Sequence, residues 1–416
     1  MLKFKNVKGE SGMKIIKIED NLWEQAKKYF EDIIREQMER VKKISSDTEF
    51  IDFTKLRPIK IGFVGGDGIG PYIVDEAKRI LQILLKDEIE KGNVIFKDIE
   101  GLTLERRIKE MKPVPDDVLE KIRECNVFLK GPTTTPKAGE GIPNIESANV
   151  FLRKEFDLFA NVRPVKVLNE KINWIFFREN TEDLYALGSK GIEFENIFGI
   201  DFRLISYAGS RRIIKMAFEY AKNNGFKRVT AVNKANVIKT TDGIFLKVFY
   251  EIARDYPEIQ ADDWFIDIMT AKLIDVKRRS EFQVFVLPNL FGDILTDEAA
   301  EIQGGVGTAG SANIGSKYAM FEAIHGSAPR MVQENRQHYA DPSSIIKAAS
   351  MMLEYIGFQS IAKKIDMALD VANQFERKVV ITGRNDGATT REFGDYLLSL
   401  IVDPKLEEKY DEFINA

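Results

Sequence analysis

Two aspartates, Asp293 and Asp297, stand four residues apart in the segment "NLFGDILTDEAAEIQ", between apolar residues. On a helix this spacing places both carboxylates on one face, roughly 5–6 Å apart at Cβ, where like charges repel by a few tenths of a kcal/mol. A hard divalent cation offsets that cost, because Mg²⁺ and Mn²⁺ prefer oxygen ligands. A third aspartate, Asp267 in "WFIDIMTAKL", lies in an apolar context that is costly for an unpaired charge. The carboxylates therefore predict a metal site; the alternative is a solvated helix face.

Three arginines indicate an anionic ligand near that metal. Arg153 lies in "SANVFLRKEF", Arg163 in "FANVR" and Arg178 in "FFREN". An arginine that ends a strand or follows phenylalanines is costly to place unless it binds a planar anion, and its planar fork suits a carboxylate. Three arginines beside a metal favour a polycarboxylate substrate, although each one alone is more typical of an ordinary ion pair.

Tyr185 in "ENTEDLY" and Lys234 in "VNKANV" are candidates for proton transfer. A lysine that is partly buried or close to other cations can have its pKa lowered enough to exchange a proton at neutral pH. Taken alone, each of these residues is more often an ordinary surface side chain.

The glycine loop "GGDGIG" follows a predicted strand, as a dinucleotide-binding loop does. Its glycines Gly66, Gly68 and Gly70 are spaced G-x-G-x-G, however, and lack the third glycine and the later acidic residue of the Rossmann fingerprint. A tight turn is the simpler interpretation. The sequence also contains no G-x-x-x-x-G-K-[ST] motif, which argues against a Walker-type nucleotidase.

The composition of the 416 residues limits the class of protein. The net charge of -4 argues against a general nucleic-acid binder, and the chain has neither an 18-residue apolar run nor a signal-peptide pattern. One cysteine, Cys125, and two histidines do not make a disulfide or a zinc site of the usual kind. We therefore expect a cytoplasmic protein with no membrane partner, and a metal bound by oxygen.

The elements that must position these side chains alternate between strand and helix. "IKIGFV", "NVFLK", "INWIFF", "RVTAVN" and "FQVFVL" read as buried strands, separated by helical stretches such as "RRIIKMAFEYAKNN". Ligands of such α/β sheets lie beyond the carboxyl ends of the strands. Residues 1–50 precede this pattern, and their helical periodicity predicts an amphipathic extension capped at Asn21 that packs on the body or on a partner subunit.

Together these segments resemble the isocitrate/isopropylmalate dehydrogenase family, the metal-dependent β-decarboxylating dehydrogenases. The resemblance covers nearly all of residues 58–400. It rests on seven segments in the family's order, namely "GDGIG" (66–70), "KGPTTTP" (130–136), "SANVFLR" (147–153), "FRENTEDLY" (177–185), "NKANV" (233–237), "NLFGDILTDEAA" (289–300) and "FEAIHGSAP" (321–329).

The resemblance implies an α/β fold that is not a classical Rossmann fold. A large cofactor-binding domain, residues 51–158 and 304–416, would contain a mixed sheet flanked by helices. A smaller α/β domain, residues 159–303, would carry substrate and dimer contacts, and residues 1–50 would be a helical extension.

It also implies roles for the residues that match the family's motifs. Arg153, Arg163 and Arg178 would bind substrate carboxylates, with Ser147 and Asn149 reaching the extra carboxylate of isocitrate. Asp293, Asp297 and the partner subunit's Asp267 would bind Mg²⁺ or Mn²⁺. Tyr185 and the partner subunit's Lys234 would transfer protons, so the active site would require a homodimer.

The implied reaction is oxidation of isocitrate and loss of CO₂ from oxalosuccinate to give 2-oxoglutarate, with NADP or NAD as hydride acceptor. The implied cofactor contacts are Lys130, Thr134, Thr135, Asn236, Glu322, His325, Gly326, Ser327, Ala328, Arg330, Met331 and Asp341. Arg330 stands where NAD-dependent members carry an acid, which favours NADP, whereas Asp341 and a short "ITGRNDGATTREFGD" loop are as in NAD-type relatives.

Two other activities fit the same scaffold. About four residues that appear inserted between "TTTP" and Ser147 leave room for a larger acid such as homoisocitrate, and 3-isopropylmalate is a further alternative. A non-catalytic regulatory subunit is the alternative from a different class, but such subunits tend to lose catalytic positions, and all of these are present here.

Overall fold

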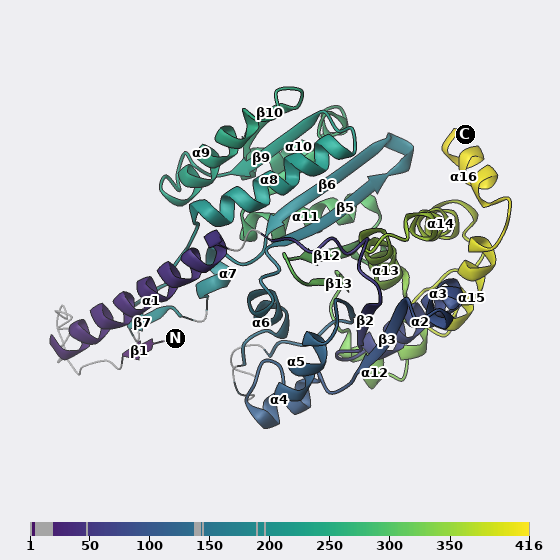
Figure 1. Cartoon of the computed structure of the whole chain (residues 1–416), viewed down its shortest axis with the longest axis horizontal. Helices are drawn as coiled ribbons and strands as arrows, with labels where there is room; N and C mark the ends of the chain where they lie inside the picture. The colour runs from purple at the N-terminus through teal and green to yellow at the C-terminus, as the bar shows by residue number, and fades with distance from the viewer. Residues whose placement is uncertain are drawn as a thin grey trace.

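β-branched and aromatic residues dominate the segments that form the central sheet of this protein. The computed structural model describes residues 2–4, 20–46, 49–136, 143, 145–188, 190–194 and 197–415. Within them, one ten-stranded sheet runs through the molecule (Figure 1). In spatial order its strands are β10 (Gln260–Phe265), β9 (Arg228–Asn233), β11 (Val284–Leu287), β6 (Ile172–Glu179), β5 (Ala160–Val167), β12 (Gly310–Ile314), β13 (Ala319–Ala323), β4 (Val127–Lys130), β2 (Ile59–Val64) and β3 (Val94–Ile99).

The sheet is mixed, with antiparallel pairs in its middle. β5 is antiparallel to both β6 and β12, and β12 is antiparallel to β13, whereas the other neighbours run parallel. All five strands expected from the sequence are present. The antiparallel centre excludes the all-parallel Rossmann arrangement and agrees with the predicted fold class.

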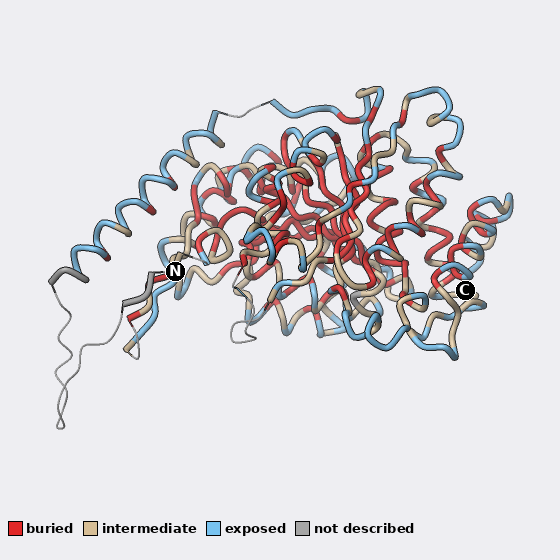
Figure 2. The backbone as a smooth tube through the Cα atoms, turned by 90° about the horizontal axis from the view of Figure 1, so that it is seen from below, coloured by how far each residue is buried: buried red, intermediate tan, exposed pale blue. Residues whose placement is uncertain are grey.

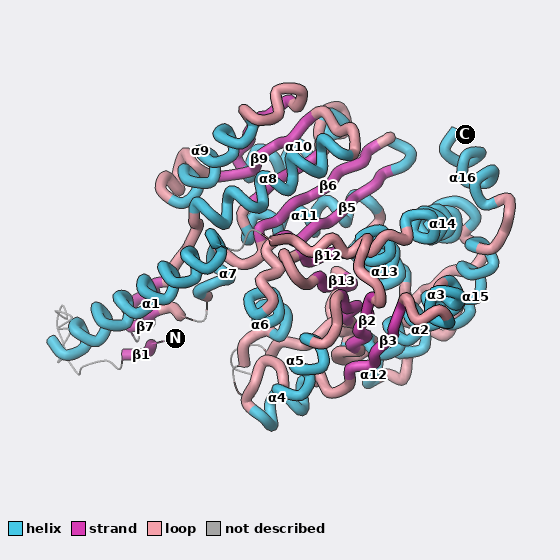
Figure 3. Tube along the Cα trace, viewed as in Figure 1, coloured by secondary structure: helices cyan, strands magenta, loops and turns pink. Residues whose placement is uncertain are grey.

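Helices cover both faces of the sheet (Figure 3). The α-helices are α1 (Asp20–Ser46), α2 (Gly70–Leu84), α3 (Lys86–Glu90), α4 (Leu104–Glu110), α5 (Asp116–Arg123), α6 (Ala148–Glu155), α7 (Asp183–Leu187), α8 (Tyr207–Asn223), α9 (Thr241–Ala253), α10 (Ile266–Ile274), α11 (Asn289–Gln303), α12 (Pro329–Gln333), α13 (Ser343–Tyr355), α14 (Gln359–Asp370), α15 (Thr390–Ile401) and α16 (Leu406–Asn415). A π-helical turn, Val371–Glu376, follows α14.

The strand register brings the ends of β6 and β11 together. Leu287 of β11 is opposite Arg178 of β6, and α11 begins two residues later at Asn289. On the neighbouring strand, Arg163 pairs with Phe176. Arg163 and Arg178 therefore lie beside the first turns of α11, which carry the paired aspartates.

An aromatic core holds α11 in place. Phe176 and Phe285 stack with their ring centroids 4.5 Å apart, and Leu295 of α11 is fully buried in the same cluster. Figure 2 shows this buried interior, with exposed residues concentrated on the outer helices. Because Leu295 and Ala299 face the core, Asp293 and Asp297 must lie toward the opposite, open side of the helix.

The helix α1 projects from the body, with its C-terminal end beside α7 and α8 (Figures 1 and 2). The predicted amphipathic helix is confirmed, but it begins at Asp20, so Asn21 lies inside the helix and is not its cap. A small sheet of β1 (Leu2–Phe4), β7 (Ile192–Phe194) and β8 (Phe198–Ile200) lies next to it. No helix in the described part of the chain is both long and apolar enough to cross a membrane.

Candidate active site

The two aspartates of α11 are paired with two of the three predicted arginines. Arg178 binds the Oδ1 atom of Asp293 through its NH1 group, and Arg163 donates from NH1 to Asp297 Oδ1 at 2.9 Å. Tyr185 donates from its hydroxyl to Asp293 Oδ2 at 2.5 Å. The arginines thus offset the repulsion between the two carboxylates.

The glycine of the "FGD" segment makes room for this arrangement. A Cβ atom on Gly292 would lie 2.5 Å from Cγ of Arg178, closer than two carbon atoms can approach. Arg178 also donates to Asn289 Oδ1 from Nε at 3.0 Å and from NH2 at 2.7 Å. Asn289 is fully buried, and the sequence analysis did not assign it a role, although it lies in a quoted motif.

Burial and charge set the pKa values of this cluster. Burial works to raise the pKa of Asp293, but the charge of Arg178, the hydrogen bond from Tyr185 and the charges of Arg163 and Arg153 together hold this pKa below its usual range. Burial raises the pKa of Tyr185 to about 12, assisted by its hydrogen bond to Asp293. Burial, with Arg153 nearby, lowers the pKa of Arg178 to about 10. At neutral pH the cluster therefore holds a protonated tyrosine between an arginine and a carboxylate.

The third arginine, Arg153 at the end of α6, belongs to a buried triad. Its NH2 group donates to Glu322 Oε1 at 3.0 Å, and Lys130 Nζ lies 3.4 Å from Glu322 Oε2. Burial alone would raise the pKa of Glu322, but Lys130 and Arg153 lower it to about 2. Lys130 and Glu322 were predicted to contact the cofactor. In the structure they are fully or almost fully buried, and Glu322 contacts both Arg153 and Lys130.

Ser147 and Asn149 lie at the start of α6, on the same helix as Arg153. Ser147 occupies the N-cap position, yet its hydroxyl makes no capping bond to the helix. Thr133 donates to Asn149 Oδ1 at 3.2 Å, which leaves the amide NH₂ directed elsewhere. The predicted insertion before Ser147 falls mostly on residues 137–142 and 144, outside the described residues.

The glycine loop after β2 packs against two loops of the predicted cofactor region. A Cβ atom on Gly68 would lie 1.9 Å from the carbonyl oxygen of Ser327. Asp67 accepts a hydrogen bond from the backbone N–H of Thr134 at 2.8 Å, and the Thr134 and Ser327 hydroxyls lie 2.6 Å apart. The loop is therefore a tight turn that joins Thr134 to Ser327.

The other predicted cofactor contacts lie mostly on surface loops. Arg330 is 82% exposed at its side chain and pairs at 2.6 Å with Glu334, the C-cap residue of the same short helix. His325 Nδ1 lies 3.0 Å from its neighbour's carbonyl oxygen, and burial raises the pKa of Asp341. The remaining positions range from half-buried to exposed, namely Thr135, Asn236, Gly326, Ala328 and Met331.

Lys234 and Asp267 lie apart from this cluster and bind each other. Lys234 Nζ donates to Asp267 Oδ1 at 2.5 Å, and the Asp267 side chain is 62% exposed. The expectation that Asp267 occupies an apolar, desolvated context is therefore wrong, because it begins helix α10 at the surface. Exposed apolar side chains lie near these residues in the sequence, namely Val237, three positions after Lys234, and Ile268, directly after Asp267; Ile294, directly after Asp293, is also exposed.

The donor set suits a divalent cation in part. Among the described residues, no group of three or more histidine, cysteine or acidic side chains is placed to hold a metal. Asp293 and Asp297 present hard oxygen ligands one helical turn apart, with partly exposed carboxylates. They fit Mg²⁺ or Mn²⁺ as two oxygen ligands from one helix.

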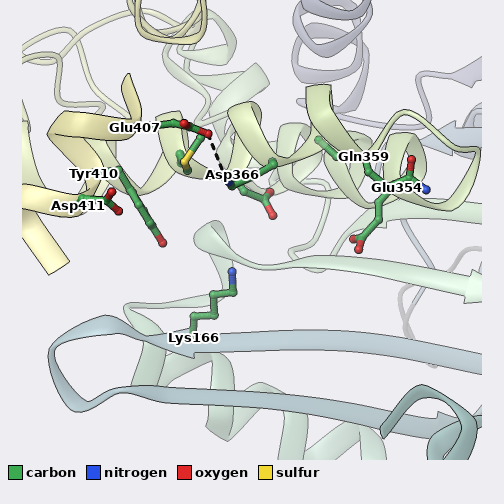
Figure 4. Close-up of a pocket in the computed structure, with 10 residues that line it drawn as sticks. Lys166, Glu354, Gln359, Asp366, Glu407, Tyr410 and Asp411 are labelled. Atoms are coloured by element: carbon green, nitrogen blue, oxygen red, sulfur yellow. Dashed lines mark hydrogen bonds and ion pairs between the residues drawn. The ribbon is translucent and has the colours of Figure 1, made fainter. Parts of the chain in front are cut away.

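A cavity of about 480 Å³ lies between β5 and the helices α14 and α16. Figure 4 shows Lys166 of β5 pointing toward Asp366, Glu407 and Tyr410 on the facing helices. None of the residues predicted for catalysis or binding lines it. Its acidic side chains have basic neighbours, such as the 2.7 Å pair of Lys347 with Asp366.

Comparison with known proteins identifies the family. The model of the isocitrate/isopropylmalate dehydrogenase family matches residues 60–397. The chain belongs to this family. This match confirms the fold class and the family that the seven segments predicted. Members of the family are decarboxylating dehydrogenases that use NAD(P) and a divalent metal.

Relatives in this family carry different substrate names. Isocitrate dehydrogenase [NADP] of Rickettsia bellii is 43% identical over 328 residues, which are 75% of this chain and 62% of that protein. The chain thus spans less than two thirds of that relative. Homoisocitrate dehydrogenase of Methanocaldococcus jannaschii is 39% identical over 359 residues, 82% of this chain and 98% of that protein. The crystal structure of isocitrate dehydrogenase from Methylococcus capsulatus superposes with a TM-score of 0.71 at 34% identity, covering 82% of this chain and 99% of that one.

One buried residue near the site of this family member had no signal in the sequence. Arg107 of α4 is fully buried and donates to the carbonyl oxygens of Thr134 at 2.8 Å and Glu146 at 3.0 Å. It therefore joins the cofactor-side loop to the segment before Ser147. Arg107 and its neighbour Arg106 in "LERRIKE" are both typical of a solvated helix face, and only the tertiary structure shows that Arg107 is buried.

Proposed function

We propose that the protein is a homodimeric, metal-dependent dehydrogenase that converts isocitrate to 2-oxoglutarate with NADP. The observation that carries this proposal is the convergence of Arg163, Arg178 and Tyr185 on Asp293 and Asp297. These groups match a polycarboxylate bound to a divalent cation, since guanidinium groups suit carboxylates and aspartates suit the cation.

In this proposal the three arginines exchange their protein partners for substrate carboxylates. Arg178 and Arg163 now bind Asp293 and Asp297, and Arg153 binds Glu322. A bound trianion with a divalent cation keeps the charge balanced when these contacts rearrange. Ser147 and Asn149, at the start of α6, are available to hydrogen-bond the third carboxylate, because the Ser147 hydroxyl makes no capping bond.

When bound, the metal would supply Lewis-acid polarisation of substrate oxygens, and NADP would accept the hydride. Tyr185 keeps its proton through neutral pH, because burial raises its pKa to about 12. It can therefore donate that proton to the enolate carbon left by loss of CO₂, and recover it from solvent. The partner subunit's Lys234 would accept the hydroxyl proton.

Exposed apolar residues beside Lys234 and Asp267 support the homodimer. Val237 is 67% exposed, Ile268 42% and Ile294 52%. Exposed apolar residues that cluster near functional groups are typical of a protein interface. Ile294 directly follows Asp293, so a subunit that covered it would lie next to the predicted metal site.

Homoisocitrate is the second candidate substrate. The homoisocitrate dehydrogenase of Methanocaldococcus jannaschii matches over nearly its whole length, which the Rickettsia relatives do not. A longer acid would place its distal carboxylate at the same Ser147 and Asn149.

We also propose a cytoplasmic location, which the composition of the chain favours.

A steady-state assay tests the proposal. Isocitrate, homoisocitrate and 3-isopropylmalate are each combined with NADP and NAD in the presence of Mg²⁺ or Mn²⁺. We expect the highest kcat/KM for isocitrate with NADP. A higher kcat/KM for homoisocitrate would reassign the substrate, and turnover of none of the acids would support the regulatory-subunit alternative.

A further inference from the structure

Helix α1 contacts the segment that links Arg178, predicted to bind substrate, to Tyr185, predicted to be catalytic. Arg40 of α1 donates from NH1 to Glu182 Oε1 at 3.0 Å and from NH2 to Thr181 Oγ1 at 2.9 Å. Thr181 and Glu182 lie between Arg178 and Tyr185. The family match begins at residue 60, so Arg40 lies outside the region that carries the family resemblance.

The contacted segment contains two buried carboxylates three residues apart. Glu179 is 3% exposed and Glu182 1%. Glu179 accepts hydrogen bonds from the Thr181 and Glu182 backbone N–H groups and the Thr181 hydroxyl, and Glu182 accepts them from Ser206. Two buried anions this close require counter-charges, because each is costly to desolvate.

Two arginines from separate helices supply that counter-charge. Arg40 comes from α1, and Arg212 of α8 donates to Thr181 Oγ1 at 3.0 Å while pairing with Asp157. The Arg40 side chain is only 22% exposed, and that of Glu182 only 2%. Arg212 divides its charge between Asp157 and this segment, so Arg40 is the cation that binds Glu182 directly.

The segment in turn fixes the catalytic side chains at both of its ends. Asn289 bridges the two ends of this segment. The Asn289 Oδ1 atom accepts from Arg178, and the Asn289 NH₂ group donates to the Glu182 carbonyl oxygen at 3.4 Å. Asp183 follows with φ +65 and accepts from the Leu290 backbone N–H at 2.8 Å. Tyr185 then reaches Asp293 from α7. A shift of residues 179–183 would therefore move Tyr185 relative to the aspartates.

We propose that Arg40 is a positioning residue that holds residues 179–183, and through them Tyr185 and Arg178, in the catalytic arrangement. The inference rests on the proposed function for its catalytic consequence. The N-terminal helix thus completes the active-site support from outside the family's shared fold. Arg40 itself touches neither predicted substrate nor metal ligands.

The acidic pair predicts how the effect of Arg40 varies with pH. Burial, with Glu182 nearby, raises the pKa of Glu179 to about 7. The charged groups that face it are Glu182, Arg40, Arg212 and, beyond Arg212, Asp157. Below this pKa Glu179 is neutral and one buried anion remains, whereas above it both are charged. Loss of Arg40 must therefore harm the segment more as pH rises through about 7.

The test compares Arg40→Met with Arg40→Lys and with Arg35→Met in the full chain. Arg35 lies on the same helix, is 72% exposed at its side chain and, among the described residues, pairs only with the neighbouring Glu31, so its loss is the matched control. We expect Arg40→Met to lower kcat about tenfold at pH 8.5, with KM changed less than about threefold, because small misplacements of catalytic groups reduce the rate of the chemical step. The loss shrinks toward pH 6, and Arg40→Lys restores part of kcat.

Hydrogen–deuterium exchange of the peptide that covers residues 179–187 gives a readout that does not require turnover. We expect faster exchange there in Arg40→Met and unchanged exchange in Arg35→Met. Unchanged exchange with a wild-type pH profile of kcat would overturn the role of Arg40 and leave the proposed function intact. A wild-type chain that turns over none of the acids would overturn the proposed function, and exchange alone would then decide whether Arg40 holds the segment.

Discussion

The predicted site residues fall into two halves, and the two halves differ in how deeply the chain buries them and how it pairs their charges. Asp293, Arg178 and Tyr185 form a partly buried cluster in which each charged group has a partner from another element. Lys234 and Asp267 form a pair on a more exposed surface, next to uncovered apolar side chains. The first half is therefore assembled by the fold of one chain, whereas the second lies on an exposed surface, where the proposed homodimer would place a second subunit.

The comparison shows how much the loss of a charge partner should destabilise the buried cluster and the exposed pair. Buried arginines and aspartates are held by several hydrogen bonds, and loss of one partner leaves an uncompensated charge. An exposed lysine–aspartate pair is solvated and contributes little to stability. Substitutions in the first half should affect both folding and turnover, and substitutions in the second half should affect turnover alone.

The largest effect is expected for Asp293→Asn. The asparagine oxygen can still accept from Arg178, and its NH₂ group can donate to the Tyr185 hydroxyl oxygen, so both contacts have a replacement. Asparagine is nevertheless a much weaker metal ligand than a carboxylate. We expect metal-dependent kcat to fall about a thousandfold, roughly 4 kcal/mol of transition-state stabilisation. Steady-state kinetics over a range of Mg²⁺ concentrations measure it, with circular dichroism to check the fold. Undiminished turnover would remove Asp293 from the metal site.

Glu322→Gln tests the buried triad beneath Arg153. The substitution leaves Lys130 and Arg153 buried without their shared carboxylate, and we expect a loss of about 3 kcal/mol in the free energy of unfolding at neutral pH. Lys130 and Arg153 hold the pKa of Glu322 at about 2. Its stabilisation is thus complete above the unfolded pKa, near 4.5, and is lost as pH falls toward 2.

Urea unfolding at several pH values measures this difference. The gap between the wild-type protein and Glu322→Gln should narrow as pH falls from about 5 toward 2. Glu334→Gln is the matched control, because Glu334 pairs with the exposed Arg330, and we expect it to change stability by less than about 1 kcal/mol. Equal stability of the wild-type protein and Glu322→Gln would show that the triad is not the origin of the stability of this region.

The sequence predicted the local parts of this site better than the contacts between them. The spacing of Asp293 and Asp297 fixed their common helix face, and the strands that end near Arg178 and Lys234 were recognisable from their β-branched and aromatic residues. The spacing did not show that Arg163 and Arg178 neutralise the aspartates, because those pairs join residues more than a hundred positions apart. The surface position of Asp267 was missed for a different reason. Apolar neighbours in the sequence do not decide which side of a short helix faces solvent.

Mixing two inactive variants tests whether the two halves meet across a dimer. In a shared site, a heterodimer of Asp293→Asn and Lys234→Met contains one site with both substitutions and one site with neither. Random association makes half of the dimers heterodimers, so we expect about one quarter of wild-type activity to return. Co-refolding and an activity assay measure it, with each variant refolded alone as the control. If all catalytic groups of a site came from one chain, the mixture would be no more active than its components.

The smallest effect is expected at the most exposed charge of the predicted cofactor region. Within the described part of the chain, Arg330 pairs only with the nearby Glu334, and its side chain is 82% exposed, so it can bind a 2′-phosphate at little structural cost. Arg330→Asp should lower the NADP/NAD ratio of kcat/KM about tenfold or more, because an acid repels the phosphate and accepts hydrogen bonds from ribose hydroxyls. Arg330→Lys keeps the charge and should retain most of the ratio. Because the ion pair with Glu334 is exposed, the midpoint of unfolding should hardly move in either variant, so a change in the ratio reports cofactor recognition rather than folding. An unchanged ratio in Arg330→Asp would remove Arg330 from cofactor selection and leave Asp341 and the short loop before α15, both as in NAD-type relatives, as the better guide.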